Sequence, residues 1–121
     1  MPFQYTLANL VADNPGTIAV LFLDETGETV DLACADYTPY EMKIVGAYLG
    51  IYLRQLAILA ESGLLGATEL LHIEKDEIHL FAAPLADGYY LALIQRRPAL
   101  VARTLRSLRA ARDEIVREIF S

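Results

Sequence analysis

The chain is poor in the residues that carry most enzyme chemistry. The single cysteine, Cys34, excludes an intramolecular disulfide framework and a zinc site built from cysteines. Serine occurs only at positions 62, 107 and 121, and the two histidines are far from Cys34 in sequence. No nucleophile–base pair stands out, and the scattered glycines form neither a phosphate loop nor a dinucleotide fingerprint. We therefore expect no catalytic site and no cofactor.

Two long stretches each lack charge of one sign. Residues 1–42 hold seven acidic residues and no basic one, whereas residues 95–112 hold six arginines and no acid. The net charge of −6 argues against nucleic acid as a partner. The arginine-rich stretch could serve an acidic partner or a membrane surface. The favoured alternative is that it forms the solvated face of a helix and pairs with the acidic half.

A long uncharged run is also missing. The longest in the middle of the chain is 44–53, ten residues bracketed by Lys43 and Arg54, and a membrane-spanning helix needs about 20. The first residues, 1–4, show neither a basic region nor a long apolar stretch of the kind found in signal peptides. We expect no membrane insertion, and a cytosolic protein.

The segment 38–61 is the most informative part that is present. Thr38 suits an N-cap, Pro39 the first helical position and Glu41 the third, which together predict a capping box and a helix over 39–61. Of the 21 residues from 40 to 60, 15 are apolar or Tyr. Because a surface helix normally shows one apolar stripe, this helix needs cover on more than one side. We expect its own sheet to cover one side and a second copy of the chain to cover another.

Hydrophobic patterning predicts one domain, residues 1–121, with the element order helix, two strands, helix, three strands, helix. Asp-x-x-Gly at 24–27 and Asp-Gly at 87–88 predict tight turns. The predicted segments are a short helix over 3–12, strands over 17–23 and 28–35, the long helix over 39–61, strands over 69–74, 77–84 and 89–95, and a helix from residue 98.

The hairpin around residues 75–76 brings both histidines together. With Lys75-Asp76 as a two-residue turn, Glu74 lies opposite Glu77 and His72 lies opposite His79, all on one face of the sheet. Two histidines flanked by carboxylates are candidate zinc ligands or a pH-sensitive contact. A polar face without special chemistry is the favoured interpretation.

Four segments together resemble the roadblock family, which is named for dynein light chains. They are the buried strand that ends in a turn at 17–27, the apolar helix 39–61, Gly-Leu-Leu-Gly at 63–66, and Pro-Leu-Ala-Asp-Gly-Tyr-Tyr-Leu-Ala-Leu-Ile at 84–94. The resemblance covers nearly the whole chain and includes no catalytic motif. It implies an α+β fold of order αββαβββα, with a five-stranded antiparallel sheet, the long helix on one face and both terminal helices on the other.

The resemblance also implies a homodimer in which the long helices pack together and the third strands pair edge to edge. Glycine in a helix interior costs about 1 kcal/mol relative to alanine, so Gly46 and Gly50 call for a packing reason. Close approach to a partner helix is one; close approach to the domain's own strands is the other. The expected interface residues are Gly46, Ala47, Gly50, Leu53, Ala57, Leu70, His72 and Glu74.

By resemblance, the chain is a non-enzymatic regulator or scaffold that binds a small Ras-like GTPase. Bacterial members of the family act as GTPase-activating partners in motility and polarity systems, and an arginine finger is the other general route to activation. The candidate partner contacts are Tyr40, Lys43, Ala47, Gly50 and Arg54. The alternatives are a structural dimerisation module and a ligand-binding sensor, which would need a sizeable apolar pocket beneath a helix.

Overall fold

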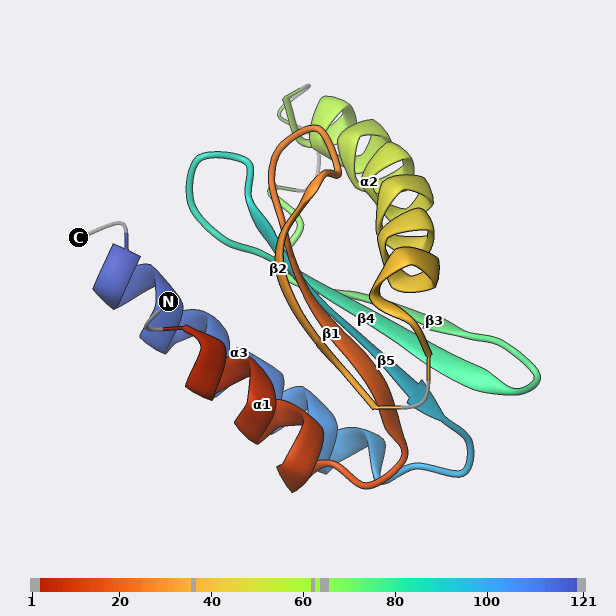
Figure 1. The fold of residues 1–121 in the computed structure, drawn as a ribbon. Helices are drawn as coiled ribbons and strands as arrows, with labels where there is room; N and C mark the ends of the chain where they lie inside the picture. The colour runs from red at the N-terminus through yellow and green to blue at the C-terminus, as the bar shows by residue number, and fades with distance from the viewer. Residues whose placement is uncertain (1–2, 36, 62, 64–65, 120–121) are drawn as a thin grey trace.

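A computed structural model describes residues 3–35, 37–61, 63 and 66–119. Its five strands form one antiparallel sheet in the order β2-β1-β5-β4-β3. One helix, α2, lies on one face of the sheet, and α1 and α3 lie side by side on the other (Figure 1). The predicted order and layering are confirmed. The elements are α1 (Gln4–Asp13), β1 (Thr17–Leu23), β2 (Thr29–Cys34), α2 (Pro39–Glu61), β3 (Leu71–Glu74), β4 (Ile78–Pro84), β5 (Tyr90–Arg96) and α3 (Val101–Ile119).

Strands β1 and β5 form the centre of the sheet because both of their faces are covered. Every residue of β1 is buried, as its continuous apolar run predicts. Successive side chains along each of these strands point to opposite faces of the sheet and so belong to two separate cores. Val20 and Leu93 belong to the core beneath α1 and α3, whereas Leu21 and Ile94 belong to the core beneath α2.

The start of α2 is the predicted capping box. The Thr38 hydroxyl accepts a hydrogen bond from the Glu41 backbone N–H at 3.2 Å. The Glu41 carboxylate in turn accepts from the Thr38 backbone N–H at 3.2 Å and from its hydroxyl at 2.9 Å. This reciprocal pair satisfies N–H groups that lack partners in the first helical turn. The helix ends at Glu61, and the predicted Gly-Leu-Leu-Gly break lies partly outside the described residues, at Leu64 and Leu65.

Both predicted glycine turns are present. Gly27 has φ +85° and its N–H donates to the Asp24 carbonyl at 3.0 Å. Asp87 and Gly88 have φ +58° and +82°, which is the pattern of a two-residue turn that matches the twist of a hairpin.

The predicted register of the β3–β4 hairpin is wrong. The structure pairs Glu74 with His79 and His72 with Phe81, and the Lys75 N–H donates to the Ile78 carbonyl at 2.8 Å. The turn is therefore Asp76-Glu77, one residue later than predicted. Because the shift moves the pairing by two residues, both histidines still lie on the same face of the sheet.

Candidate subunit and partner interface

Helix α2 covers only part of its face of the sheet. It packs on β1 and β2, and no helix of the described chain packs extensively on β3. The α2 side of β3 and β4 therefore carries an apolar area that is only half-buried. Its residues are Leu71, Ile73, Ile78 and Leu80, which we call the open sheet area.

Helix α2 also carries a second apolar face that points away from its own sheet. Tyr48 is 64% exposed and Ile58 is 66% exposed. From Ile44 the spacing runs 4, 3 and 7 residues to 48, 51 and 58, which is the period of a helix that packs along another helix. We call this face the outer stripe; it consists of Ile44, Tyr48, Ile51, Tyr52, Ile58 and Leu59.

The expected interface role of Gly46, Gly50 and Leu53 is corrected by the structure. A Cβ on Gly50 would lie 2.5 Å from Gly27 Cα, and one on Gly46 would lie 3.0 Å from Leu23 Cδ2. The Leu53 side chain is 1% exposed. All three residues face the chain's own sheet and β1–β2 turn, so the alternative explanation of the two glycines holds. The sequence signal for the outer stripe was the heptad spacing of its large apolar residues.

The remaining predicted interface residues differ in accessibility. Ala47 and Ala57 on α2 are exposed, as are His72 and Glu74 on β3. Leu70 lies just before β3, half-buried against the core beneath α1 and α3. The four exposed residues can meet a partner, whereas Leu70 mainly supports its own domain.

The predicted partner contacts lie along one flank of α2, with two exceptions. Tyr40, Lys43 and Ala47 are exposed, and the last two line a hollow of about 330 Å³ beside the β1–β2 turn. Gly50 is buried beneath that turn. Arg54 donates from Nη1 to the Thr26 carbonyl at 2.8 Å, so its guanidinium holds the turn against α2.

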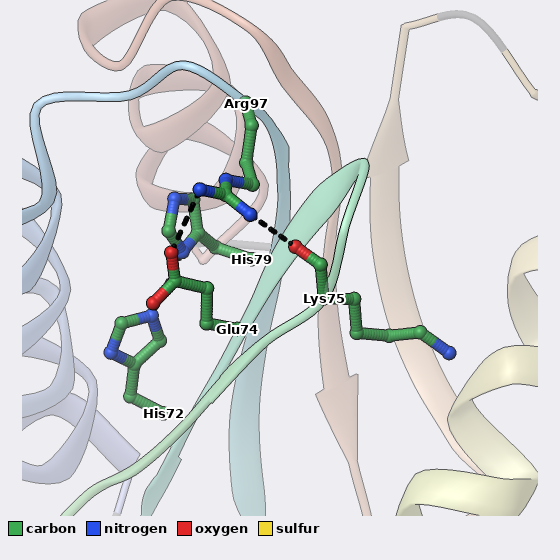
Figure 2. Close-up of polar contacts among 5 residues, drawn as sticks. All are labelled: His72, Glu74, Lys75, His79 and Arg97. Atoms are coloured by element: carbon green, nitrogen blue, oxygen red, sulfur yellow. Dashed lines mark hydrogen bonds and ion pairs between the residues drawn. The ribbon is translucent and has the colours of Figure 1, made fainter.

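A polar cluster lies on the opposite face, where the β3–β4 hairpin meets the end of β5 (Figure 2). His72 Nε2 and His79 Nδ1 are 2.9 Å apart. The guanidinium of Arg97 reaches back across the hairpin, with Nη2 2.9 Å from Glu74 Oε1 and Nη1 donating to the Lys75 carbonyl at 2.8 Å.

The metal hypothesis for the two histidines gains no support from this geometry. Facing nitrogens at 2.9 Å share one hydrogen, so one of them is protonated and the lone pair of the other accepts the hydrogen bond; neither facing nitrogen is then free to bind zinc. No group of three or more His, Cys, Asp or Glu in the described ranges has the geometry to hold a metal ion.

The favoured expectation for the arginine-rich stretch holds in its first part, because Arg103, Arg106 and Arg109 lie exposed on the α3 helix. The pairing with the acidic half is not seen in the ion pairs described for this stretch. The two ion pairs described for it join Arg97 to Glu74 and Arg112 to Asp113, neither of which lies in residues 1–42. Arg103, Arg106 and Arg109 on α3 form no ion pair with any described carboxylate.

An apolar pocket of about 280 Å³ lies between the C-terminal half of α2 and the β4–β5 turn, with Leu53, Leu56 and Tyr89 in its lining. The Tyr90 hydroxyl donates to the Leu53 carbonyl at 3.4 Å, and burial raises the pKa of this phenol. The pocket is slightly smaller than the usual small-molecule site. Its size therefore gives little support to the alternative that the chain is a ligand-binding sensor.

One described segment, Pro39–Leu59, is long and apolar enough to cross a membrane by length and composition. This measure is weak evidence, because helices that pack inside soluble proteins satisfy it too. This segment also carries the outer stripe. Its apolar composition and its exposed stripe are therefore two views of the same excess of apolar surface.

Comparison with solved structures identifies the fold. The chain matches a roadblock/LC7 domain from Streptomyces avermitilis with a TM-score of 0.80 and 17% identity over 97% of each chain. It matches MglB of Myxococcus xanthus with a TM-score of 0.82 and 14% identity, over 97% of this chain and 96% of that one. It matches MglC of the same organism with a TM-score of 0.74 and 18% identity, over 98% and 100%. No protein-family model and no curated protein matches the sequence. The architecture of this chain is therefore the roadblock fold.

Proposed function

We propose that this protein is a homodimeric, non-enzymatic regulator that binds a small Ras-like GTPase in the cytosol. The observation that carries the proposal is the apolar surface that one chain leaves uncovered. The outer stripe of α2 and the open sheet area lie on the same side of the molecule, and monomeric proteins rarely expose contiguous apolar surface of this kind.

A second copy related by a two-fold axis can cover both surfaces at once. The outer stripe of each protomer packs against that of its partner, and the partner's α2 extends over the open sheet area. The same axis brings the β3 edges together, which supplies partners for the backbone groups of an edge strand. Exposed His72 and Glu74 would then lie at the seam between the two sheets.

The GTPase is proposed as the partner because roadblock proteins, which this chain resembles in sequence pattern and matches in fold, include bacterial GTPase-activating partners. A structure with which it shares the fold is described as the gliding protein MglB from Thermus thermophilus. The α2 flank formed by Tyr40, Lys43 and Ala47 is the proposed contact, since it remains beside the outer stripe after dimer formation. The chain would act by reshaping the GTPase's switch loops.

The test is a binding titration against Ras-like GTPases encoded near this protein, each loaded with GDP or a non-hydrolysable GTP analogue. We expect binding that depends on the nucleotide. Lys43→Glu should weaken it at least about tenfold without changing the dimer. Arg106→Glu, a matched charge reversal on exposed α3, should leave it unchanged.

The possible outcomes separate the alternatives. Binding that ignores the nucleotide and leaves GTP hydrolysis unchanged would identify a structural dimerisation module. Absence of binding to every neighbouring GTPase would overturn the proposed regulator.

A further inference from the structure

The two histidines are hydrogen-bond partners on the face of the hairpin opposite α2. His79, on β4, is 4% exposed, whereas His72, on β3, is exposed. The His72 ring stacks on Phe81 with centroids 4.6 Å apart. Because a nitrogen–nitrogen contact of 2.9 Å holds one hydrogen, one ring must offer a lone pair.

The charged side chains described near this pair are matched in sign. Glu74 lies directly across the ladder from His79, yet its carboxylate is held by Arg97. On α3, which packs over β4 and β5, Arg112 pairs with Asp113 at 3.2 Å and donates from Nη1 to the Glu69 carbonyl at 3.4 Å, just before β3.

The other neighbours are neutral or lie in solvent. The β5 residue opposite His79 is Gln95, a neutral side chain that accepts a hydrogen bond from the Thr104 hydroxyl of α3. The charged turn residues Lys75, Asp76 and Glu77 are exposed to solvent. Helix α1 packs on β1, β2 and α3, away from this hairpin.

Strand β3 depends on this face for its position. It has only four residues, Leu71–Glu74, and no described helix packs extensively on it. Its attachment therefore rests on the ladder to β4 and on contacts such as His72 with His79 and Glu74 with Arg97. Elements with so few contacts open first under stress.

We propose that the His72–His79 pair is a proton-sensitive clasp that holds β3 in place for the partner subunit, an inference that rests on the proposed dimer. The pair accommodates one added proton, because an imidazolium can donate to the remaining lone pair. A second proton sets two N–H groups against each other beside Arg97. The rings separate, β3 frays from β4, and the dimer weakens as the pH falls.

The test is the dimer dissociation constant measured by sedimentation equilibrium at about pH 7.5 and about pH 5.5, which bracket the ordinary titration of histidine. We expect the constant to rise at least about tenfold at the lower pH, a change of about 1.4 kcal/mol. His72→Phe keeps an aromatic ring on Phe81 and removes one imidazole, so its dimer should respond less than about twofold.

Glu74→Gln is the matched control, because it breaks the pair with Arg97 and leaves both imidazoles in place; its dimer should keep the pH response. If His72→Phe does not fold, His72→Gln replaces it. Hydrogen-exchange protection of the β3 amides, corrected for intrinsic rates, should fall at the lower pH in the wild type and not in the variant.

The outcomes keep the two proposals apart. A wild-type chain that is monomeric at both pH values overturns the dimer and the clasp together. A dimer with the same dissociation constant at both pH values overturns the clasp alone. A pH response that persists in the His72 variant also overturns it, because the response would then arise elsewhere.

Discussion

Gly50 shows at the scale of one residue why α2 lies where it does. Its Cα packs against the β1–β2 turn so closely that a Cβ would lie 2.5 Å from Gly27 Cα and 3.2 Å from Gly27 N. The clash is with backbone, which cannot move without displacing the turn. At Gly46 the nearest atom is the end of the Leu23 side chain, at 3.0 Å.

We therefore predict that Gly50→Ala lowers the free energy of unfolding by about 2 kcal/mol or more, despite the better helix propensity of alanine. Gly46→Ala should cost less, because the Leu23 side chain can rotate. Urea denaturation of both variants measures the difference. Equal stability of the two variants would contradict the close packing of α2 on the turn.

The carboxyl group of Asp24 leads to a prediction about how the stability of the fold depends on pH. Its Oδ1 accepts from the Thr26 hydroxyl at 2.7 Å, the Thr26 N–H at 2.9 Å and the Glu28 N–H at 3.0 Å. The hydroxyl contributes most to lowering the carboxyl pKa below its ordinary value of 3.8. A pKa lowered in the folded state means stability that is present above pH 3.8 and lost as the pH falls through the folded value.

Asp24→Ala should accordingly lower the free energy of unfolding by about 1 kcal/mol at neutral pH. The difference from wild type should shrink below pH 3.8. Glu25→Gln, an exposed neighbour, is the control and should differ little from wild type at either pH. A deficit for Asp24→Ala that is constant across this range would exclude the ionised carboxylate as its source.

At the scale of the element, α2 shows what sequence patterns can and cannot reveal. Its start and end follow from the chemistry of single residues, so the capping box at Thr38 was predictable. Its inward face was assigned wrongly, because the small residues were used to choose it and the heptad spacing of the large apolar residues on the outer face was not. The small residues were assigned to a partner, whereas Gly46 lies against Leu23 and Thr29 of the chain's own strands and Gly50 lies against its β1–β2 turn.

The turns of the two hairpins differ in how well the sequence predicts their position. Asp87-Gly88 was located correctly because few residues adopt the left-handed backbone that the turn requires. The segment 75–77 contains no glycine, so its sequence does not specify which two residues turn, and the predicted pairing was one turn position early. The alternation of polar and apolar residues still assigned His72 and His79 to one face.

The outer stripe of α2 leads to a prediction about dimer formation. Ile51→Glu places a charge at its centre, so we expect the dimer dissociation constant to rise at least about 100-fold while the monomer stays folded, because an unpaired buried charge is costly. Ala102→Glu on exposed α3 is the matched control and should leave the constant unchanged. Sedimentation and circular dichroism together distinguish dissociation from unfolding. An unaffected dimer in Ile51→Glu would place the interface elsewhere.

At the scale of the whole molecule, the helices cover the two faces of the sheet to different extents. Helices α1 and α3 together cover one face, whereas α2 alone covers part of the other (Figure 1). The layering could be predicted from element order, but the extent of the uncovered area could not, since it depends on where α2 crosses the sheet. A second copy of the chain is the proposed cover.

The mass of the particle in solution tests this account most directly. Sedimentation equilibrium at micromolar concentration and neutral pH should give a mass of about twice the 13.4 kDa of one chain. Dilution should then reveal a reversible dissociation. A single species of 13.4 kDa across the micromolar range would contradict the account, because the outer stripe and the open sheet area would then be stable in water without a partner.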